Sequence, residues 1–324
     1  WRGGEEGCIS RLNKTREGVE MSEKKCQIQP MQEGDIEQVI GLDKNLGGDA
    51  RPEFFNKRMQ AMGRSPETHI SFVASVNGQL CGFLFAHVLK GEFGTHQPVA
   101  VIDALGVQPG EQGSGVGMLL MNALKQEAAK RGCGSLRTQA NWHQQELLAY
   151  FANAGFTLAA RNVLTRDTSP LALDEGDDIE LRPVRSLAES DLDSIRRIDR
   201  HITNEDRETY LTQKVSEVIS DSGVRVSMVA EQDGLVAGFV MARVDYGSFG
   251  RAESTAVVDT LGVGPEYKGA GIGSALMAQL MDNLASLQVE NVRTEVEWEN
   301  FDLNRFLASS GFRPAQELSL SCAL

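Results

Sequence analysis

Short apolar runs with strand-like spacing alternate along the chain with longer segments whose apolar residues recur at helical spacing. Residues 70–76 and 80–88 are predicted to form two strands, and the Asn77-Gly78 pair between them is a strong signal for a two-residue hairpin. Residues 224–230 and 236–244 repeat the pattern around Asp233-Gly234. Helix-like segments flank both hairpins, so the pattern predicts an α+β fold.

This pattern occurs twice. A step of 156 positions takes Asp103 to Asp259 and superposes most of the two halves of the chain. Only the opening strands are predicted to differ, with residues 28–30 corresponding to residues 181–183 at a step of 153. A duplicated domain explains a constant step better than chance does.

The repeat divides the chain into four segments. Residues 1–25 are polar without a clear period and are expected to be a disordered extension. Residues 26–166 and 179–324 are the two predicted domains, and residues 167–178, rich in acidic residues, are the predicted linker.

A glycine-rich turn joins a strand-like run to a helix-like run in each half, at residues 107–117 and again at residues 263–273. The backbone N–H groups of such a turn, with the positive end of a helix dipole behind them, can receive a phosphate or pyrophosphate. A Walker loop needs Lys-Ser or Lys-Thr after its last glycine, and neither copy has it. A dinucleotide fingerprint needs a third glycine where Leu120 and Leu276 stand.

Composition excludes several other classes of function. The net charge of −13 argues against nonspecific nucleic-acid binding and is compatible with cationic substrates such as amines. The five cysteines include no C-x-x-C pair, which favours reduced thiols in a cytoplasmic protein and no metal site. No apolar run is long enough to cross a membrane, and the first residues lack the apolar core of a secretory signal.

Both glycine turns fit the pattern V-x-P-x-x-[Q/R]-x-x-G-x-G, with Gln112 at the Q/R position in the first copy and Lys268 there in the second. The pattern resembles the coenzyme A loop of the GNAT superfamily of N-acetyltransferases. The order of predicted elements is also similar to that fold over the whole chain apart from the first residues and the linker. The resemblance implies two tandem acyl-CoA N-acyltransferase domains, each a mixed, mostly antiparallel twisted sheet flanked by helices.

The resemblance further implies acetyl-CoA as co-substrate and an amine as acceptor, which attacks directly in a ternary complex. A small amine, a peptide N-terminus and a lysine side chain all remain open as acceptors, and so does the oligomeric state. In this family the fourth and fifth strands splay apart around the pantetheine arm. The residues that the resemblance assigns to acetyl-CoA are Leu105, Val107, Gln112, Gly113, Ser114, Gly115, Val116, Gly117, Leu261, Val263, Lys268, Gly269, Ala270, Gly271, Ile272, Gly273 and Asn300.

The attacking amine must lose a proton, so a general base is expected. Many family members carry a carboxylate on the fourth strand, at a position that is Val101 or Val257 here. Asp103 and Asp259 stand two residues later, on the same strand face by period-two alternation. Each could serve as the base or could hold a partner across the sheet, and both interpretations stay open.

A second family position for a carboxylate, on the fifth strand, is Gln139 in the first half and Glu295 in the second. Glu295 is therefore a candidate base, and the second half is favoured for deprotonation. The tyrosine that commonly protonates the leaving thiolate is replaced by Phe151 and Leu307, and Tyr150 is expected to be a core residue. These losses leave an alternative, a non-catalytic acyl-CoA-binding or regulatory module in which one or both domains are degenerate.

Overall fold

The computed structural model describes residues 26–47, 51–90, 98–170, 183–216, 219, 226–246 and 254–324. The predicted extension at residues 1–25 and residues 171–178 of the predicted linker lie outside them. The predicted domain boundaries therefore stay a prediction.

The two halves contain the same elements in the same order. In the first half these are β1 (Cys26–Pro30), α1 (Ile36–Gly47), α2 (Pro52–Arg64), β2 (His69–Val76), β3 (Gln79–Leu89), β4 (Val99–Val107), α3 (Val116–Lys130), β5 (Ser135–Asn141), α4 (Gln145–Asn153), β6 (Thr157–Leu158) and β7 (Arg161–Asp167). In the second half they are β8 (Val184–Ser186), α5 (Leu192–Thr203), α6 (Glu208–Ser216), β9 (Met228–Gln232), β10 (Leu235–Tyr246), β11 (Ser254–Val263), α7 (Ile272–Ser286), β12 (Asn291–Glu297), α8 (Phe301–Ser309), β13 (Arg313–Pro314) and β14 (Glu317–Ala323). One-turn 3-10 helices also occur, among them Pro109–Glu111 and Pro265–Tyr267 just before the glycine turns.

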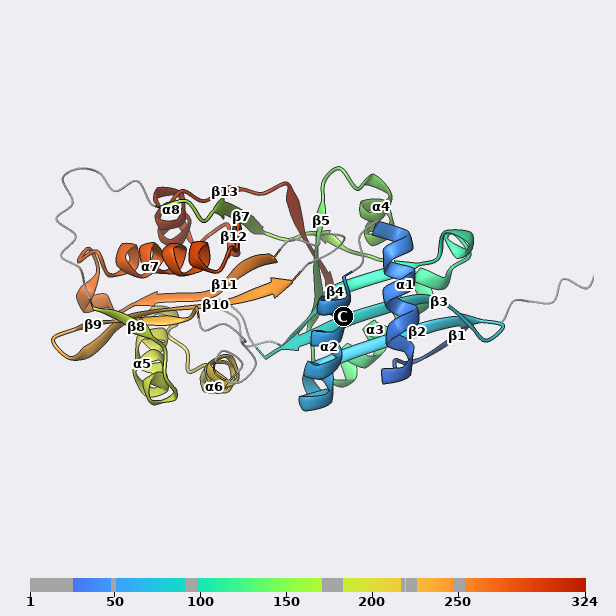
Figure 1. The fold of residues 1–324 in the computed structure, drawn as a ribbon, viewed down its shortest axis with the longest axis horizontal. Helices are drawn as coiled ribbons and strands as arrows, with labels where there is room; N and C mark the ends of the chain where they lie inside the picture. Colours follow the sequence, from blue (N-terminus) through green and yellow to red (C-terminus); the bar gives the residue numbers. More distant parts are fainter. Residues whose placement is uncertain are drawn as a thin grey trace, which may run out of the picture.

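The elements form two seven-stranded mixed sheets that lie side by side, each flanked by helices (Figure 1). Their strand orders are β1-β2-β3-β4-β5-β14-β6 and β8-β9-β10-β11-β12-β7-β13. Among the described strands, only β4 with β5 and β11 with β12 pair in parallel, and the other pairs are antiparallel. The predicted fold class is confirmed.

The two halves exchange their last long strands. β7 belongs to the first half of the chain but pairs with β12 over seven residues, from Arg161 opposite Glu297 to Asp167 opposite Asn291. β14 pairs with β5 in the same register, from Glu317 opposite Asn141 to Ala323 opposite Ser135. Each sheet is thus completed by a strand from the other half, and neither sheet is made of one continuous segment of chain.

The predicted hairpins are present. Asn77 and Gly78 have φ values of 52° and 78°, and Asp233 and Gly234 have 53° and 76°, as the two central residues of a type I′ turn require. The prediction of a different step at the opening strands is wrong. Ile28 pairs with Ala74 and Val184 pairs with Ala230, and both residues of the second pair lie 156 positions after those of the first.

Helices cover both faces of each sheet. In the first half α3 and α4 bury Leu120, Met121 and Phe151 against one face, and α1 and α2 bury Phe54 and Phe55 against the other. In the second half α7 and α8 take the place of α3 and α4, and α5 and α6 take the place of α1 and α2. The face toward α1 and α2, or α5 and α6, also carries the polar side chains of the central cavity described below.

Candidate active site

The two parallel strands of the first sheet separate after a short paired stretch. β4 pairs with β5 at Val99, Ala100 and Val101, the last of which lies opposite Arg137. Two residues further along β4, Asp103 is an extra residue in the β3–β4 ladder, because Phe85 pairs with Ala104 and the next residue of β3 with Ile102. A β-bulge of this kind bends the strand and interrupts its pairing. β4 therefore turns away from β5, and a slot begins at Arg137.

The second sheet repeats this arrangement, but its slot is bridged. β11 and β12 pair as far as Val257 opposite Arg293, and Asp259 is the extra residue. Just beyond the last pair, Thr294 Oγ1 donates a hydrogen bond of 3.0 Å to the carbonyl of Val258 across the gap. A side chain thus ties together the strands that would have to part around a ligand.

The equivalent hydroxyl of the first slot makes no such bridge. Thr138 is 2% exposed, and its Oγ1 has no hydrogen-bond partner among the residues that the structure describes. A buried hydroxyl usually has a partner, because leaving it without one costs about 1–3 kcal/mol. Thr138 lies where a ligand in the slot would supply that partner.

The predicted coenzyme A loops have a backbone suited to a phosphate. Gly113 and Gly115 have φ values of 75° and 96°, and Gly269 and Gly271 have 78° and 76°. Side-chain-bearing residues rarely adopt this conformation. A Cβ added at any of the four would find no atom within 4 Å, so the space in front of each loop is open. The helices α3 and α7 begin directly after these glycines, where the first N–H groups lack partners within the helix.

The other residues assigned to acetyl-CoA lie on β4 and β11, beside the glycines of the loops, and at the start of α8. Gln112 Nε2 donates a 3.0 Å hydrogen bond to the carbonyl of Val107, which fixes the loop against the end of β4. Leu105 lines the central cavity, and Asn300 caps α8 by accepting a 3.2 Å hydrogen bond from the N–H of Leu303. Leu261, Val263 and Ala270 pack against the second core, Val116 and Ile272 are buried under the loops, and Ser114 and Lys268 are exposed.

The third glycine of each loop has a packing role. A Cβ on Gly117 would lie 3.0 Å from the ring of Tyr150, and one on Gly273 would lie 3.1 Å from the ring of Phe306. Tyr150 donates a 2.7 Å hydrogen bond to the carbonyl of Gly117, and burial raises the pKa of its hydroxyl. Tyr150 thus binds α4 to α3 and is a poor proton donor.

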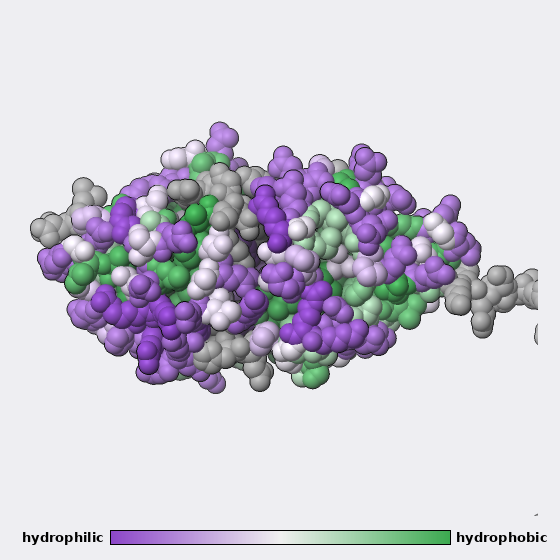
Figure 2. Space-filling model, turned by 90° about the horizontal axis from the view of Figure 1, so that it is seen from below, coloured by the Kyte–Doolittle hydropathy of each residue, from purple (hydrophilic) through white to green (hydrophobic). Residues whose placement is uncertain are grey.

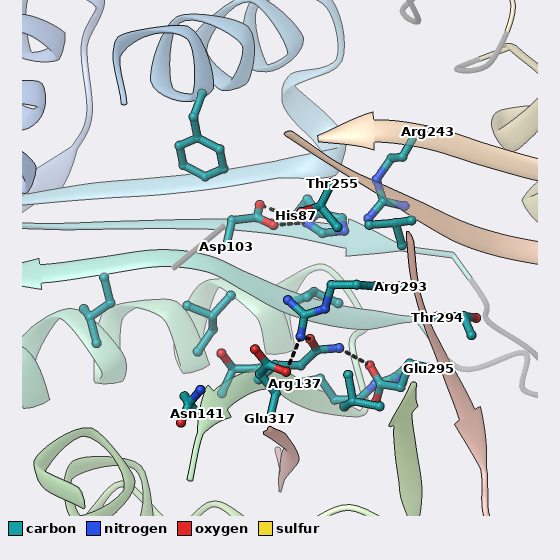
Figure 3. A pocket seen from close by; sticks show the side chains of 18 of the residues that line it. His87, Asp103, Arg137, Asn141, Arg243, Thr255, Arg293, Thr294, Glu295 and Glu317 are labelled. Atoms are coloured by element: carbon teal, nitrogen blue, oxygen red, sulfur yellow. Dashed lines mark hydrogen bonds and ion pairs between the residues drawn. The ribbon is translucent and has the colours of Figure 1, made fainter. Parts of the chain in front are cut away.

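A cavity of about 720 Å³ lies where the two halves meet (Figure 3). Its wall is built from β3, β4, β5, α1, α2 and α4 of the first half and from α6, β10, β11 and β12 of the second. The exchanged strands β7 and β14 add Arg161, Val163 and Glu317. Along the first slot the wall extends to Leu105 and Leu147, whereas β11 contributes residues only up to Asp259. The cavity is therefore an extension of the first slot.

Asp103 lies in this wall, but Arg58 and His87 both bind its carboxylate. Arg58 Nη2 donates to Oδ1 at 3.1 Å, and His87 Nδ1 lies 2.9 Å from both carboxylate oxygens. Burial alone raises the pKa of Asp103, but the charges of Arg58 and His87 outweigh it and lower the pKa to about 2. A carboxyl group of that acidity is a weak base near neutral pH.

Asp259 is also bound by two basic side chains from the equivalent elements, but these are of different residue types. It forms an ion pair with Arg243 of β10, and Lys214 Nζ of α6 lies 3.6 Å from its Oδ2. Burial raises the pKa of Asp259, and the charges of Arg243 and Lys214 more than reverse that shift. In both halves a basic side chain from the second helix and another from the hairpin hold the aspartate on the bulge.

Glu295 lies at the centre of the molecule, beside its counterpart in the repeat. Gln139 Nε2 donates a hydrogen bond of 2.8 Å to Glu295 Oε2, and the two residues are 156 positions apart. The hydroxyl of Ser319 on the exchanged strand β14 donates to the other oxygen of the carboxylate. Since Gln139 belongs to the first slot, the structure brings the carboxylate of the second half to the first.

Several charged residues near Glu295 are not among the site residues predicted from the sequence, and they are Arg137, Arg161, Arg293 and Glu317. Arg293 forms an ion pair of 2.9 Å with Glu317, and Arg161 forms one of 2.9 Å with Glu297. Arg137 lies at the fork between β4 and β5 and is buried. Arg137 and Arg293 occupy the same strand face as Gln139 and Glu295, two residues earlier, so alternation alone could have identified them.

Among the helices of the described ranges, none is both long and apolar enough to pass through a bilayer. The same ranges contain no cluster of three or more His, Cys, Asp or Glu side chains arranged to hold a metal ion.

Comparison with known families supports the assignment made from the loops. The profile of the acetyltransferase (GNAT) family matches residues 43–156 and 192–312, together well over half of the chain. The chain belongs to the GNAT acetyltransferase family. No curated protein resembles it closely enough to count as a relative. The duplication is equally clear in this match, because the profile fits each half once.

Solved structures share the fold of this GNAT protein. It is similar to a tandem GNAT protein from the clavulanic acid biosynthesis pathway, with 18% identity, a TM-score of 0.66, and 92% of this chain and 98% of that chain covered. It is also similar to a glucosamine N-acetyltransferase region of a fungal multi-domain β-N-acetylglucosaminidase, with 15% identity and a TM-score of 0.67. That match covers 93% of this chain and 38% of the other. A GNAT protein from Sphaerobacter thermophilus has 14% identity, a TM-score of 0.57 and coverage of 92% and 95%. At these identities the similarity shows the fold alone.

Proposed function

We propose that the protein is an N-acetyltransferase that uses acetyl-CoA as donor and an amine as acceptor, and that transfer takes place in the first slot. The observation that carries this proposal is the continuity of three features: an open glycine loop, a slot between diverging strands, and a cavity that reaches Leu105 in that slot. Family membership supports acyl transfer in general.

The residues of the first half fit the donor. The N–H groups at the start of α3 would bind the pyrophosphate, and the unpaired edge of β4 beyond Val101 would bind the pantetheine amides. Thr138 adds a hydroxyl inside the slot. Bound acetyl-CoA would supply the thioester whose carbonyl carbon the amine attacks. Backbone N–H groups near Leu105 would then stabilise negative charge on that carbonyl oxygen.

We assign the role of general base to Glu295. Its carboxylate lines the cavity, and the hydrogen bonds from Gln139 and Ser319 fix its orientation. It would take the proton that the amine loses as the C–N bond forms and the C–S bond breaks, and the departing thiolate would take a proton from solvent. Asp103 and Asp259 instead bind the basic side chains around them, which keeps this part of the cavity wall in place.

The second half contributes the base and closes the cavity. The Thr294 bridge across its slot, and the end of the cavity wall at Asp259, favour a supporting role for this half. Its glycine loop keeps the open geometry, so it remains a candidate for binding a second acetyl-CoA. The cytoplasmic location expected from the cysteines stays a prediction.

Glu295→Gln tests the assigned base in an amine acetylation assay. The amide keeps the shape and can still bind Gln139 and Ser319, but it cannot accept the proton. We expect kcat to fall about 10²- to 10⁴-fold with little change in acetyl-CoA affinity. Release of CoA thiol, with mass spectrometry of the acetylated amine, measures this. An unchanged kcat would remove Glu295 from the mechanism, and a folded protein that binds acetyl-CoA but acetylates no amine would contradict the proposed function.

A further inference from the structure

The central cavity is basic although the protein is acidic. Its wall contains seven Lys or Arg side chains and five Asp or Glu side chains, in a chain whose net charge is −13. Four of the five carboxylates form ion pairs with four arginines of the wall, in the pairs Asp43–Arg51, Asp103–Arg58, Asp259–Arg243 and Glu317–Arg293. The remaining two arginines of the wall are Arg137 and Arg161, and Arg161 forms an ion pair of 2.9 Å with Glu297, which lies outside the wall.

The internal repeat shows what is unusual about these two arginines. A step of 156 positions takes Arg137 to Arg293 and Arg161 to Glu317. On one side of the pseudo-symmetric centre an arginine therefore meets a carboxylate, with 2.9 Å between Arg293 Nη2 and Glu317 Oε2. On the other side an arginine stands where that carboxylate would be.

Both arginines are shielded from solvent. Arg137 is 8% exposed, and the side chain of Arg161 is 9% exposed. Burial lowers the pKa of Arg137 to about 10, and the positive charge of Arg161 adds to the shift, while Glu295 and Glu297 act in the opposite sense. Two guanidinium groups so placed favour an anion, and a planar carboxylate suits the fork of an arginine.

The position of Arg137 relates this charge to the reaction. Arg137 is the last residue of β5 paired with β4, so its side chain lies at the mouth of the first slot. Arg137 also interacts electrostatically with Glu295, the assigned base. An anionic group held at Arg137 would thus place an amine a few bonds away between the slot and Glu295.

We propose that the acceptor is an amino acid or a related amine that carries a carboxylate close to its amino group. The carboxylate binds between Arg137 and Arg161, so that it pairs with Arg137 as Glu317 pairs with Arg293 on the other side of the repeat, and the amine faces Glu295. This proposal rests on the proposed N-acetyltransferase function.

The test compares matched acceptors in the same assay. Free L-amino acids, their carboxamides and the corresponding decarboxylated amines are each supplied with acetyl-CoA to the full-length protein. We expect kcat/KM for the best amino acid to exceed that for its carboxamide by at least about 30-fold. Arg161→Glu should abolish this preference, since the ligand carboxylate would meet a like charge.

A second variant separates recognition from misfolding. Arg161→Glu combined with Glu297→Asn copies the opposite side of the repeat, where Glu317 faces Asn141 across the strands. This double variant should fold, bind acetyl-CoA and also lose the preference. Equal turnover of acid and carboxamide by the wild type, or a preference that persists in both variants, overturns the inference while the acetyltransferase function stands. If acetyl-CoA binds and no acceptor reacts, the proposed function fails and this inference with it.

Discussion

The aspartate on each bulge shows how single side chains hold the cavity together. Asp103 receives Arg58 from α2 and His87 from β3, and its counterpart Asp259 receives Lys214 from α6 and Arg243 from β10. The residue types differ between the halves, but in each half one basic side chain comes from the second helix and one from the hairpin. A buried carboxylate bound in this way stabilises the fold, because its removal leaves cations without a partner.

Asp103→Asn should therefore lower stability in a pH-dependent way. The pKa of Asp103 is about 2 in the folded protein, below its ordinary value of 3.8. Its stabilisation is thus complete above about pH 4 and is lost as the pH falls through about 2. We expect the free energy of unfolding at pH 7 to fall by about 2–3 kcal/mol in the variant, with a smaller difference from wild type at pH 3.

Chemical denaturation at both pH values measures these differences. A variant as stable as wild type at pH 7 would show that Arg58 and His87 do not depend on this carboxylate. The exposed ion pair of Arg196 with Asp206 provides a control, since Asp206→Asn should change stability much less than Asp103→Asn does.

The sequence could place Asp103 on the correct strand but not identify its partners. Strand alternation put it on the face of the active site, and both possible roles were left open. The partners lie 16 and 45 positions away, so their approach depends on how β3 and α2 pack, which no local pattern encodes. The sequence identifies Glu295 as a candidate base. Its contact with Gln139 could not be predicted, because that contact forms only when the two halves meet.

At the scale of elements, the exchanged strands β7 and β14 decide how the halves are joined. Leu164 of β7 is buried in the core of the second half, and Leu320 of β14 is buried in the core of the first. Each core therefore includes a leucine from the other half of the chain. Through this exchange Arg161 also reaches the wall of the central cavity, and Ser319 reaches Glu295.

Truncation of these leucines should act across the chain. We expect Leu320→Ala to raise amide hydrogen exchange mainly in β5 and Leu164→Ala to raise it mainly in β12, with losses of stability of about 2–5 kcal/mol each. The two variants control for each other, because they occupy equivalent positions. If Leu320→Ala loosened β12 and left β5 protected, the strands would not be exchanged in solution.

The sequence predicted the elements well and the exchange not at all. Hairpin turns, glycine loops and the repeat follow from local chemistry, so they could be identified. β7 and β14 are equivalent strands of seven residues, and either sheet offers a matching edge. Which edge each strand takes depends on contacts formed only after both sheets exist.

At the scale of the whole molecule, the two halves differ at the cavity between them. Hydrophilic side chains are widespread on the face shown in Figure 2, while the cavity wall holds six arginines and five carboxylates. Duplication followed by divergence accounts for this difference. One half keeps an open slot, and the other supplies Glu295 to it and bridges its own slot through Thr294.

Native mass spectrometry with acetyl-CoA is the first experiment to make, because it shows whether the first glycine loop holds the donor. The variants are Gly115→Glu and Gly271→Glu. Each puts a negative charge where the phosphates would bind, and a side chain at a positive φ that strains it. Gly117 and Gly273 stay unchanged to preserve their packing. We expect the folded wild type to bind acetyl-CoA and Gly115→Glu to bind one molecule fewer per chain. The number bound by Gly271→Glu shows whether the second loop holds a further molecule. A folded wild type that binds none, or a Gly115→Glu variant with full stoichiometry, would contradict the assignment of the donor to the first loop.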